Sequence, residues 1–299
     1  MDRGGRPDRA VRRCHHAVDP LRGRVFRPSS DAGDLPEVPR PYRCIPPIRL
    51  EHAGRGLDPH GSGGAVMAEF EATVFDAPTE RIRQMTAVIR SALTGLPSPR
   101  KMLDLGCGTG LQALDLAKEL PDTAMVGIDV SANSIAAAKA IGDLSGRCDF
   151  RQADYMAFNE GPFDLVVTDS CLQWIEAEDS RLAAKLATDV APGGLLILTM
   201  PERCGFNLAL FSVRRILALL RSPLTDAAIL WLARRLHPHH DPAMLRQRVD
   251  YMYWVPRRLW DHAFARMLAD RKFKVVSDEP MTHASLGQPK HRTVVLLRR

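Results

Sequence analysis

The sequence predicts an α/β fold, in which a mostly parallel sheet of seven strands has helices on both faces. Between residues 79 and 200, short apolar runs alternate with amphipathic helical segments, which is typical of βαβ units. Residues 201–271 then carry helical patterns alone, over a stretch far too long for a simple connection. We therefore expect a helical insertion between strands 5 and 6, with two further strands after it.

The expected elements follow in order along the chain, each with ordinary start and stop signals. A first helix begins at Thr79, carries apolar residues at helical spacing as far as Leu93, and ends before Gly95 and Pro97. Strands are expected at 102–105, 124–128, 149–152, 163–168, 195–200, 273–277 and 293–297. Helices are expected at 111–120, 131–141 and 180–190, and within the insertion at 208–220, 226–236, 242–253 and 257–271. Ser131 is a suitable N-cap for the helix that it opens.

Residues 1–66 differ in composition from the rest of the chain. They contain 9 Gly and 9 Pro, and no run in them has helical or strand periodicity. We expect either a disordered tail or translated upstream sequence ahead of a true start at Met67. The folded domain then comprises residues 67–299, with a helical cap at 201–271. Residues 1–66 contain 12 Arg and 8 acids and therefore carry +4 of the net charge of +6. Because most of the positive charge lies outside the folded domain, it gives no reason to expect nucleic acid as a partner.

The overall composition is that of an ordinary soluble protein able to bury a core, with 45% hydrophobic and 25% charged residues. The longest apolar runs, such as Ala227–Ala233, have about seven residues, whereas a membrane-spanning helix needs about 20. No positive segment followed by an apolar one opens the sequence, so we expect no secretory signal, and the six cysteines form no CxxC pair. We therefore expect a cytoplasmic protein with no membrane partner, no disulfide scaffold and no metal site.

A glycine-rich segment between the first strand and the next helix is the most informative part of the sequence. It reads Leu-Asp-Leu-Gly-Cys-Gly-Thr-Gly over residues 103–110, where glycines allow a sharp turn and a close backbone approach to a ligand. A dinucleotide-binding fingerprint would have glycine in place of Leu111, so a nicotinamide-dependent oxidoreductase is disfavoured. Asp129, nineteen residues after Gly110, ends the second strand, where an acid can accept hydrogen bonds from both ribose hydroxyls.

The spacing Asp-x-Gly-x-Gly-x-Gly resembles the first motif of the class I S-adenosylmethionine-dependent methyltransferases, and further segments resemble that family's later motifs in order: Gly127–Ser131, Gln152–Asp154, Phe163–Val167 and Ala191–Leu195. The resemblance implies a Rossmann-like sheet and S-adenosyl-L-methionine as cofactor. The residues it implies for cofactor binding are Asp104, Gly106, Cys107, Gly108, Gly110, Asp129, Val130, Ala153, Asp154 and Asp169. Asp104 would orient the loop or reach the amino group of the cofactor's methionine. Taken alone, Asp129 and Asp154 could also be helix caps.

Within this family, Leu172-Gln173-Trp174 after the fourth strand resembles the small-molecule branch that includes the trans-aconitate and malonyl-carrier-protein methyltransferases, which esterify carboxylates. The resemblance makes Gln173 and Trp174 candidates for the acceptor pocket, where the indole would exclude water. Trp174 could also simply belong to the core. The Asn-Pro-Pro-Tyr type motif of amino- and nucleobase-methylating members is absent after the fourth strand, so methylation of DNA adenine is not expected.

The distribution of charge fits an anionic substrate. Residues 67–200 contain 11 basic and 19 acidic side chains, whereas residues 201–271 contain 12 Arg and 6 acids. Arg257 and Arg258 are candidates to hold a carboxylate, because Arg can do so with two parallel hydrogen bonds. Tyr253, close to them in the sequence, is a further candidate for the acceptor pocket. A solvated helix face is the other interpretation of these charges.

The sequence therefore predicts a methyltransferase that acts on a small-molecule acceptor, with a carboxylate or another oxygen as the methylated group. A carboxylate needs no general base, whereas a phenol or alcohol would need one, with His262 or His283 as candidates. The alternative is a non-catalytic protein that binds S-adenosylmethionine and uses its helical cap for assembly or interaction. No oligomeric state is predicted.

Overall fold

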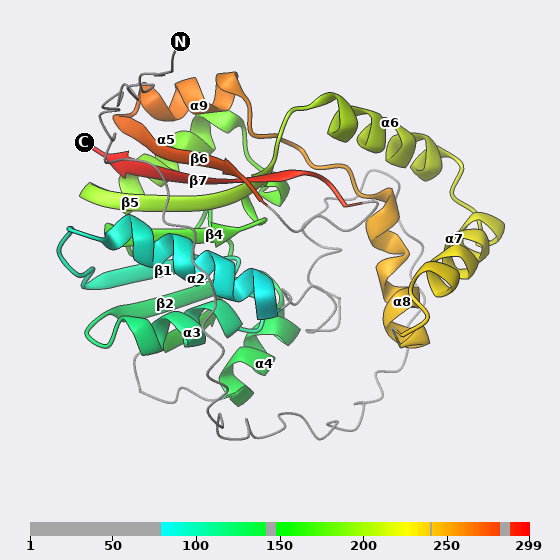
Figure 1. Cartoon of the computed structure of the whole chain (residues 1–299), viewed down its shortest axis with the longest axis horizontal. Helices are drawn as coiled ribbons and strands as arrows, with labels where there is room; N and C mark the ends of the chain where they lie inside the picture. The colour runs from blue at the N-terminus through cyan, green and yellow to red at the C-terminus, as the bar shows by residue number, and fades with distance from the viewer. Residues whose placement is uncertain (1–78, 142–147, 240, 282–287) are drawn as a thin grey trace, which may run out of the picture. The chain divides into compact units, whose positions relative to one another are not determined.

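The computed structural model describes residues 79–141, 148–239, 241–281 and 288–299, all of which belong to a compact unit formed by Gly56–Arg299 (Figure 1). The expected tail at 1–66, the expected start at Met67 and the general-base candidate His283 lie outside the described residues.

The seven strands form one sheet in the order β3-β2-β1-β4-β5-β7-β6. They are β1 (Lys101–Leu105), β2 (Ala124–Asp129), β3 (Cys148–Gln152), β4 (Phe163–Asp169), β5 (Val190–Pro201), β6 (Phe273–Pro280) and β7 (His291–Arg298). Strands β1 to β5 pair in parallel, and β7 is antiparallel to both of its neighbours. This arrangement confirms the prediction of a mostly parallel, Rossmann-like sheet of seven strands.

Helices cover both faces of the sheet, as predicted (Figure 1). The helices that do so are α2 (Thr79–Leu93), α3 (Leu111–Glu119), α4 (Ala132–Ile141), α5 (Asp179–Asp189) and α9 (His262–Ala269). Helices α2, α3 and α4 share a buried apolar cluster with Met102, whereas α5 and α9 share the other cluster with Leu103. Neighbouring residues of β1 thus point into different clusters, which is the alternation of a strand buried on both faces. Ser131 caps α4 as predicted, because its Oγ accepts the N–H of Ser134 at 3.2 Å.

The helical insertion lies between β5 and β6, as predicted. It contains α6 (Gly205–Leu219), α7 (Pro223–Leu236), α8 (Pro242–Arg248), the 3₁₀ turn η3 (Asp250–Tyr253) and, last, α9, which packs on the sheet. The predicted helix at 242–253 is wrong beyond Arg248, where the chain continues into η3. In the parts of the chain that the structure describes, no helix is both long enough and apolar enough to cross a membrane.

The helix predicted at 257–271 is wrong in its first turn, because α9 begins only at His262. The carboxylate of Asp261 caps it by accepting the N–H of Phe264 at 2.9 Å. The residues before this cap are held by tertiary contacts: the N–H of Arg257 donates to the carbonyl of Gln173 at 3.0 Å. A helix there would give up these contacts.

Candidate functional site

The sheet has its topological switch point between β1 and β4: β2 and β3 follow β1 on one side, and β5 and the later strands follow β4 on the other side. In open α/β sheets, ligands bind in the crevice outside the carboxyl ends of the strands at such a point. The glycine-rich segment follows β1 there, Asp129 ends β2, and Asp169 ends β4. The fold therefore brings the predicted cofactor residues of three strands to one edge.

Two glycines of the loop are required by its geometry. Gly106 and Gly110 have φ angles of 76° and 78°, in the left-handed region that side chains rarely adopt. A Cβ on Gly106 would lie 2.5 Å from the Cβ of Cys171, and one on Gly110 would lie 2.6 Å from the ring of Phe150. Gly110 is also the N-cap of α3 and has no side chain of its own to cap the first N–H groups of that helix.

Asp129 ties the end of β2 to this loop. Its Oδ2 accepts the N–H of Gly108 at 3.0 Å, and its Oδ1 accepts the N–H of Ser131 at 2.8 Å. Burial raises the pKa of Asp129, and the N–H groups of Ser131, Gly108 and Val130 oppose this shift. The carboxylate thus lies at the predicted place and in this state accepts backbone hydrogen bonds, as the capping interpretation expects.

The third strand brings its predicted residues to the same edge. The N–H of Ala153 donates to the carbonyl of Asp129 at 3.0 Å, which places the chain after β3 beside the end of β2. Asp154 closes a turn, since its Oδ1 accepts the N–H of Met156 at 2.9 Å. Its side chain, like that of Asp129, accepts a hydrogen bond within a local turn.

Asp104 is the buried acid of the site. The N–H of Ala113, in the first turn of α3, hydrogen-bonds its carboxylate, but its Oδ2 has no hydrogen-bond partner among the described residues. Burial, and then the charges of Asp169 and Asp129, raise the pKa of Asp104 to about 7. A carboxylate with one unpaired oxygen, beside two other carboxylates, is a place where a cationic ligand group is stabilised.

Asp169 is paired with an arginine that the sequence analysis missed. Arg81 of α2 donates from Nε to Oδ2 of Asp169 at 2.7 Å and from Nη2 to its Oδ1, and Nη2 also reaches Ser170 Oγ at 2.6 Å. Thr199 of β5 donates a further hydrogen bond to Asp169. Burial alone would raise the pKa of Asp169, but Arg81 and Thr199 together hold it below its usual value. No sequence signal marked Arg81, because it precedes the glycine motif on a helix that the motif does not include.

The two cysteines at this edge are not arranged as nucleophiles. Burial raises the pKa of both the Cys107 and the Cys171 thiols, and the neighbouring acids Asp104 and Asp129 raise them further. Cys107 lies in the loop, and Cys171 packs against the α-carbon of Gly106. Both side chains therefore contribute packing beneath the glycine loop.

A small cavity of about 10 Å³ adjoins this edge, between the sheet and the insertion. That is roughly the space that one water molecule needs. Its lining residues are Gln173, Trp174, Pro201, Phe211, Arg214, Tyr251, Pro256, Pro289 and His291. Gln173 is buried, and its Oε1 has no hydrogen-bond partner within the described part of the chain. The two predicted acceptor-pocket residues Gln173 and Trp174 thus lie together.

Aromatic side chains and a buried cation form one side of this cavity. The ring of Trp174 meets that of Trp254 edge to face at 5.7 Å, and Trp254 meets Tyr251 in the same way at 6.0 Å. Arg214 of α6 is 1% exposed, and its guanidinium lies over the Tyr251 ring, 4.7 Å from the centroid. The sequence analysis missed Arg214 as a site residue.

His291, the first residue of β7, is the histidine of this cavity. Its Nδ1 lies 2.8 Å from the carbonyl of Pro289, so Nδ1 carries the proton and the Nε2 lone pair is left for other contacts. Burial, and then the positive charge of Arg81, lower the pKa of His291 to about 4. The predicted base candidate His262 is exposed at the start of α9 and does not line the cavity.

The predicted carboxylate-binding arginines lie outside this cavity. Arg258 is buried and holds the chain after β4: it donates to the carbonyls of Leu172, Ile175 at 2.9 Å and Ala177 at 2.6 Å, and its Nε donates to Asp179 at 2.8 Å. Its hydrogen bonds therefore serve the turn that presents the Leu-Gln-Trp segment.

Arg257 and Tyr253 also have protein partners. Arg257 forms an ion pair with Glu176 at the surface. The hydroxyl of Tyr253 donates to Asp226, and the guanidinium of Arg221 lies over its ring at 4.6 Å. The structure thus places neither side chain with Gln173 and Trp174.

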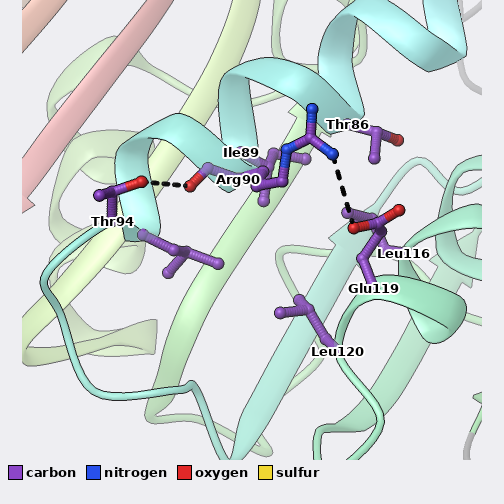
Figure 2. A pocket seen from close by; sticks show the side chains of 8 residues that line it. Thr86, Ile89, Arg90, Thr94, Leu116, Glu119 and Leu120 are labelled. Atoms are coloured by element: carbon purple, nitrogen blue, oxygen red, sulfur yellow. Dashed lines mark hydrogen bonds and ion pairs between the residues drawn. The ribbon is translucent and has the colours of Figure 1, made fainter.

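A larger cavity, of about 170 Å³, lies between α2 and α3. Figure 2 shows Arg90 and Glu119 reaching toward one another across it, and their ion pair measures 3.8 Å. The other side chains are mostly apolar, and the α3 residues that line it come from the end of that helix, whereas the glycine loop precedes its start. This cavity contains none of the predicted site residues and is separate from the site.

Comparison with known proteins agrees with this geometry. Residues 102–194 match the family model of a methyltransferase domain. A trans-aconitate 2-methyltransferase of Methylobacterium nodulans is 35% identical over 138 residues, which are 46% of this chain and 51% of that protein. One of Deinococcus radiodurans is 37% identical over 101 residues, 34% of this chain and 38% of that protein. The chain thus spans about half or less of the length of these curated relatives.

Solved structures share the fold. The N-methyltransferase NodS of Bradyrhizobium japonicum, in complex with S-adenosyl-L-homocysteine, aligns with a TM-score of 0.51 and 17% identity over 79% of this chain and 98% of that chain. The [4+2]-cyclase SpnF aligns with a TM-score of 0.50 and 16% identity over 77% of this chain and 84% of that chain. The ordered motifs, the strand order and the family match together show that this chain carries a class I S-adenosylmethionine-dependent methyltransferase domain.

Proposed function

We propose that the protein is an S-adenosylmethionine-dependent methyltransferase that methylates a carboxylate of a small, anionic acceptor. The observation that carries this proposal is the buried oxygen of Asp104, which has no hydrogen-bond partner among the described residues and lies beside the glycine loop. The cavity lined by the buried Arg214 adjoins the same edge of the sheet. An acid on one side and an arginine on the other match a cationic methyl donor and an anionic acceptor.

The residues present fit the cofactor. The loop keeps clear the two positions where a Cβ would collide with Cys171 or Phe150, and Asp104 offers an oxygen to a cationic group. The proposed cofactor-binding residues remain those that the motifs predict: Asp104, Gly106, Cys107, Gly108, Gly110, Asp129, Val130, Ala153, Asp154 and Asp169. When bound, S-adenosylmethionine supplies an electrophilic methyl group on a positively charged sulfur.

The acceptor side favours a carboxylate over a phenol or alcohol. Arg81 and Arg214 both lower the pKa of His291, after the larger effect of burial. The same positive charges would keep a bound carboxylic acid ionised, which is the form that attacks a methyl group. A histidine with a pKa of about 4 is a weak base at neutral pH, whereas a carboxylate acceptor needs no base.

The protein's remaining contribution is positioning and the exclusion of water. Trp174 and Tyr251 line the cavity and each packs edge to face on Trp254, and Arg258 fixes the turn from which Trp174 projects. Alignment of two reacting groups can supply up to about 7–11 kcal/mol in favourable cases. The curated relatives are named for trans-aconitate, which is itself a carboxylate, and this supports the proposed class of acceptor.

A labelled-methyl assay tests the proposal directly. The protein is incubated with methyl-labelled S-adenosylmethionine and, separately, with dicarboxylates and tricarboxylates, phenols and amines. We expect label to enter a carboxylate as an ester that mild alkali releases as methanol. An alkali-stable product would contradict a carboxyl acceptor. Cofactor binding by calorimetry without any transfer would favour the non-catalytic alternative.

Arg214 can be tested in the same assay. Arg214→Met is expected to raise the KM for the carboxylate at least about tenfold, since a buried charged partner contributes a few kcal/mol, while the affinity for S-adenosylhomocysteine is retained. The matched control is Arg266→Met on the exposed face of α9, which is expected to leave KM unchanged. Equal KM values for the two variants would show that Arg214 does not contribute to acceptor binding.

A further inference from the structure

Helix α6 buries two polar residues and only one apolar residue. Asn207, Phe211 and Arg214, at helical spacing, are its buried residues. The Asn207 amide donates to the carbonyls of Glu202 and Lys290, both at 2.8 Å. An asparagine and an arginine thus occupy the side of α6 that packs against the rest of the fold.

The opposite side of α6 is apolar and exposed. Phe206, Val213, Ile216 and Leu220 recur at helical spacing on that side, and all four are exposed. Leu219, at the end of the helix, is 82% exposed. An amphipathic helix of a soluble protein normally turns such a stripe toward the core, so α6 presents a stripe that lacks its partner among the described residues.

Helix α7 follows α6 in the chain, and Figure 1 shows it near α8 on the side of the insertion that lies away from the sheet. Although α7 is largely apolar, none of its residues is buried against the described part of the chain. Leu224 is 82% exposed and Trp231 is 60% exposed. The guanidinium of Arg235 lies over the Trp231 ring at 5.0 Å.

These exposed side chains are concentrated in two consecutive helices and the turn between them. Of the fourteen large hydrophobic residues exposed in the described residues, ten lie between Phe206 and Leu236. Single exposed apolar residues are normal, whereas a gathering of this kind marks an interaction site. We name the outward apolar side of α6 together with α7 the apolar face.

The positive charge around the apolar face indicates which partner would cover it. Residues 205–239 contain five arginines and one acid, Asp226, which is paired with Arg221 and hydrogen-bonded by Tyr253. Arg215, Arg234 and Arg235 are exposed. A second copy of this chain would bring like charges together, which disfavours association. A bilayer with anionic headgroups complements both the apolar side chains and the arginines around them.

We propose that the apolar face lies on the surface of an anionic lipid bilayer, with α6 and α7 in the plane of the headgroups. Neither helix is long enough to span a membrane, and the proposal requires no span. It departs from the expectation of no membrane partner, which rested on the shortness of the apolar runs. A run too short to cross a bilayer can still bury one side of a helix in its surface.

Vesicle binding tests the proposal on the full chain. Sedimentation with vesicles of equal parts phosphatidylcholine and phosphatidylglycerol is expected to retain the protein, with at least about tenfold weaker binding to phosphatidylcholine alone. The double variant Leu224→Glu/Trp231→Glu is expected to weaken binding to anionic vesicles at least about tenfold. Neither residue is buried, so the fold is expected to survive, and circular dichroism checks this.

The matched control adds the same two charges elsewhere. Leu96→Glu/Val276→Glu replaces two exposed apolar residues outside the apolar face and is expected to change vesicle binding less than about twofold. Absence of wild-type binding to anionic vesicles, or equal weakening by both double variants, would overturn the proposal. If the wild type self-associates but does not bind vesicles, and if Leu224→Glu/Trp231→Glu abolishes the self-association, the apolar face binds a second copy of the chain instead.

Discussion

Replacement of Asp104 by asparagine tests the electrostatics of the site without reference to any ligand. Asp104 is 4% exposed, and burial is the largest reason why its pKa is raised from 3.8 to about 7. An asparagine at this position would have nearly the same shape and could still accept the N–H of Ala113, but it cannot ionise. The variant and the wild type therefore differ in charge only where the wild-type carboxyl loses its proton.

The magnitude follows from the pKa shift. An acid whose pKa is higher in the folded state than in the unfolded state holds its proton more tightly when folded, so stability falls as the pH rises between the two values. The rise for Asp104 is about three pH units, and each unit corresponds to about 1.4 kcal/mol, giving an upper limit of about 4 kcal/mol. Between pH 5 and pH 7 the expected change is about 2–3 kcal/mol.

Urea unfolding of both proteins at pH 5, 6, 7 and 8 measures this change. The stability of Asp104→Asn relative to the wild type is expected to increase by about 2–3 kcal/mol from pH 5 to pH 7 and to level off above pH 7. Any fixed penalty of the new amide is the same at every pH and does not affect the slope. A stability difference that stays constant from pH 5 to pH 8 would refute the raised pKa.

Three further changes test other parts of the structure. Arg81→Met is expected to lower the free energy of unfolding by about 3 kcal/mol at pH 7, because it leaves the partly buried Asp169 without its cation. Since Arg81 lowers the pKa of Asp169, the loss should shrink as the pH falls below about 4. Gly110→Ala combines a φ of 78° with a Cβ 2.6 Å from a phenylalanine ring of β3, so in urea unfolding it should cost more than the roughly 1–2 kcal/mol of Gly95→Ala, which has a similar φ and open space. Arg258→Met removes hydrogen bonds to three carbonyls and a carboxylate and should lower the free energy of unfolding by about 3 kcal/mol or more; a loss under about 1 kcal/mol would show that the turn after β4 holds without it.

The sheet, and the edge at which the motif residues meet, could be predicted from the sequence because both depend on local order. Short apolar strands alternate with amphipathic helices, and the glycine loop and Asp129 each lie directly after a strand or at its end. In a parallel sheet, residues that follow strands meet at the same edge whatever the details of packing. The ends of the elements in the insertion were less predictable, because the stretch before α9 is held by contacts with β5 and the turn after β4.

The partners of the site residues could not be predicted, because they come from segments with no local signal. Arg81 reaches Asp169 over a separation of 88 residues, and His291 joins the cavity from the start of β7. The burial of Arg214 could not be predicted because the hydrophobic pattern of α6 points to a different buried side. The most apolar stripe of that helix faces outward, so an interpretation from amphipathicity alone assigns its buried side to solvent.

Arg258 and Arg214 show that two arginines of the same basic insertion can have different structural roles. Arg258 comes just before α9 and is satisfied by main-chain carbonyls and Asp179, so its charge fixes a turn. Arg214 comes from α6, stacks on Tyr251 and lines the cavity. The excess of arginine over acid in residues 201–271 is therefore a sum of distinct effects. Arg258 fixes the turn that carries Trp174, Arg214 brings a positive charge to the cavity, and the exposed arginines of α6 and α7 lie among the exposed apolar residues of those two helices.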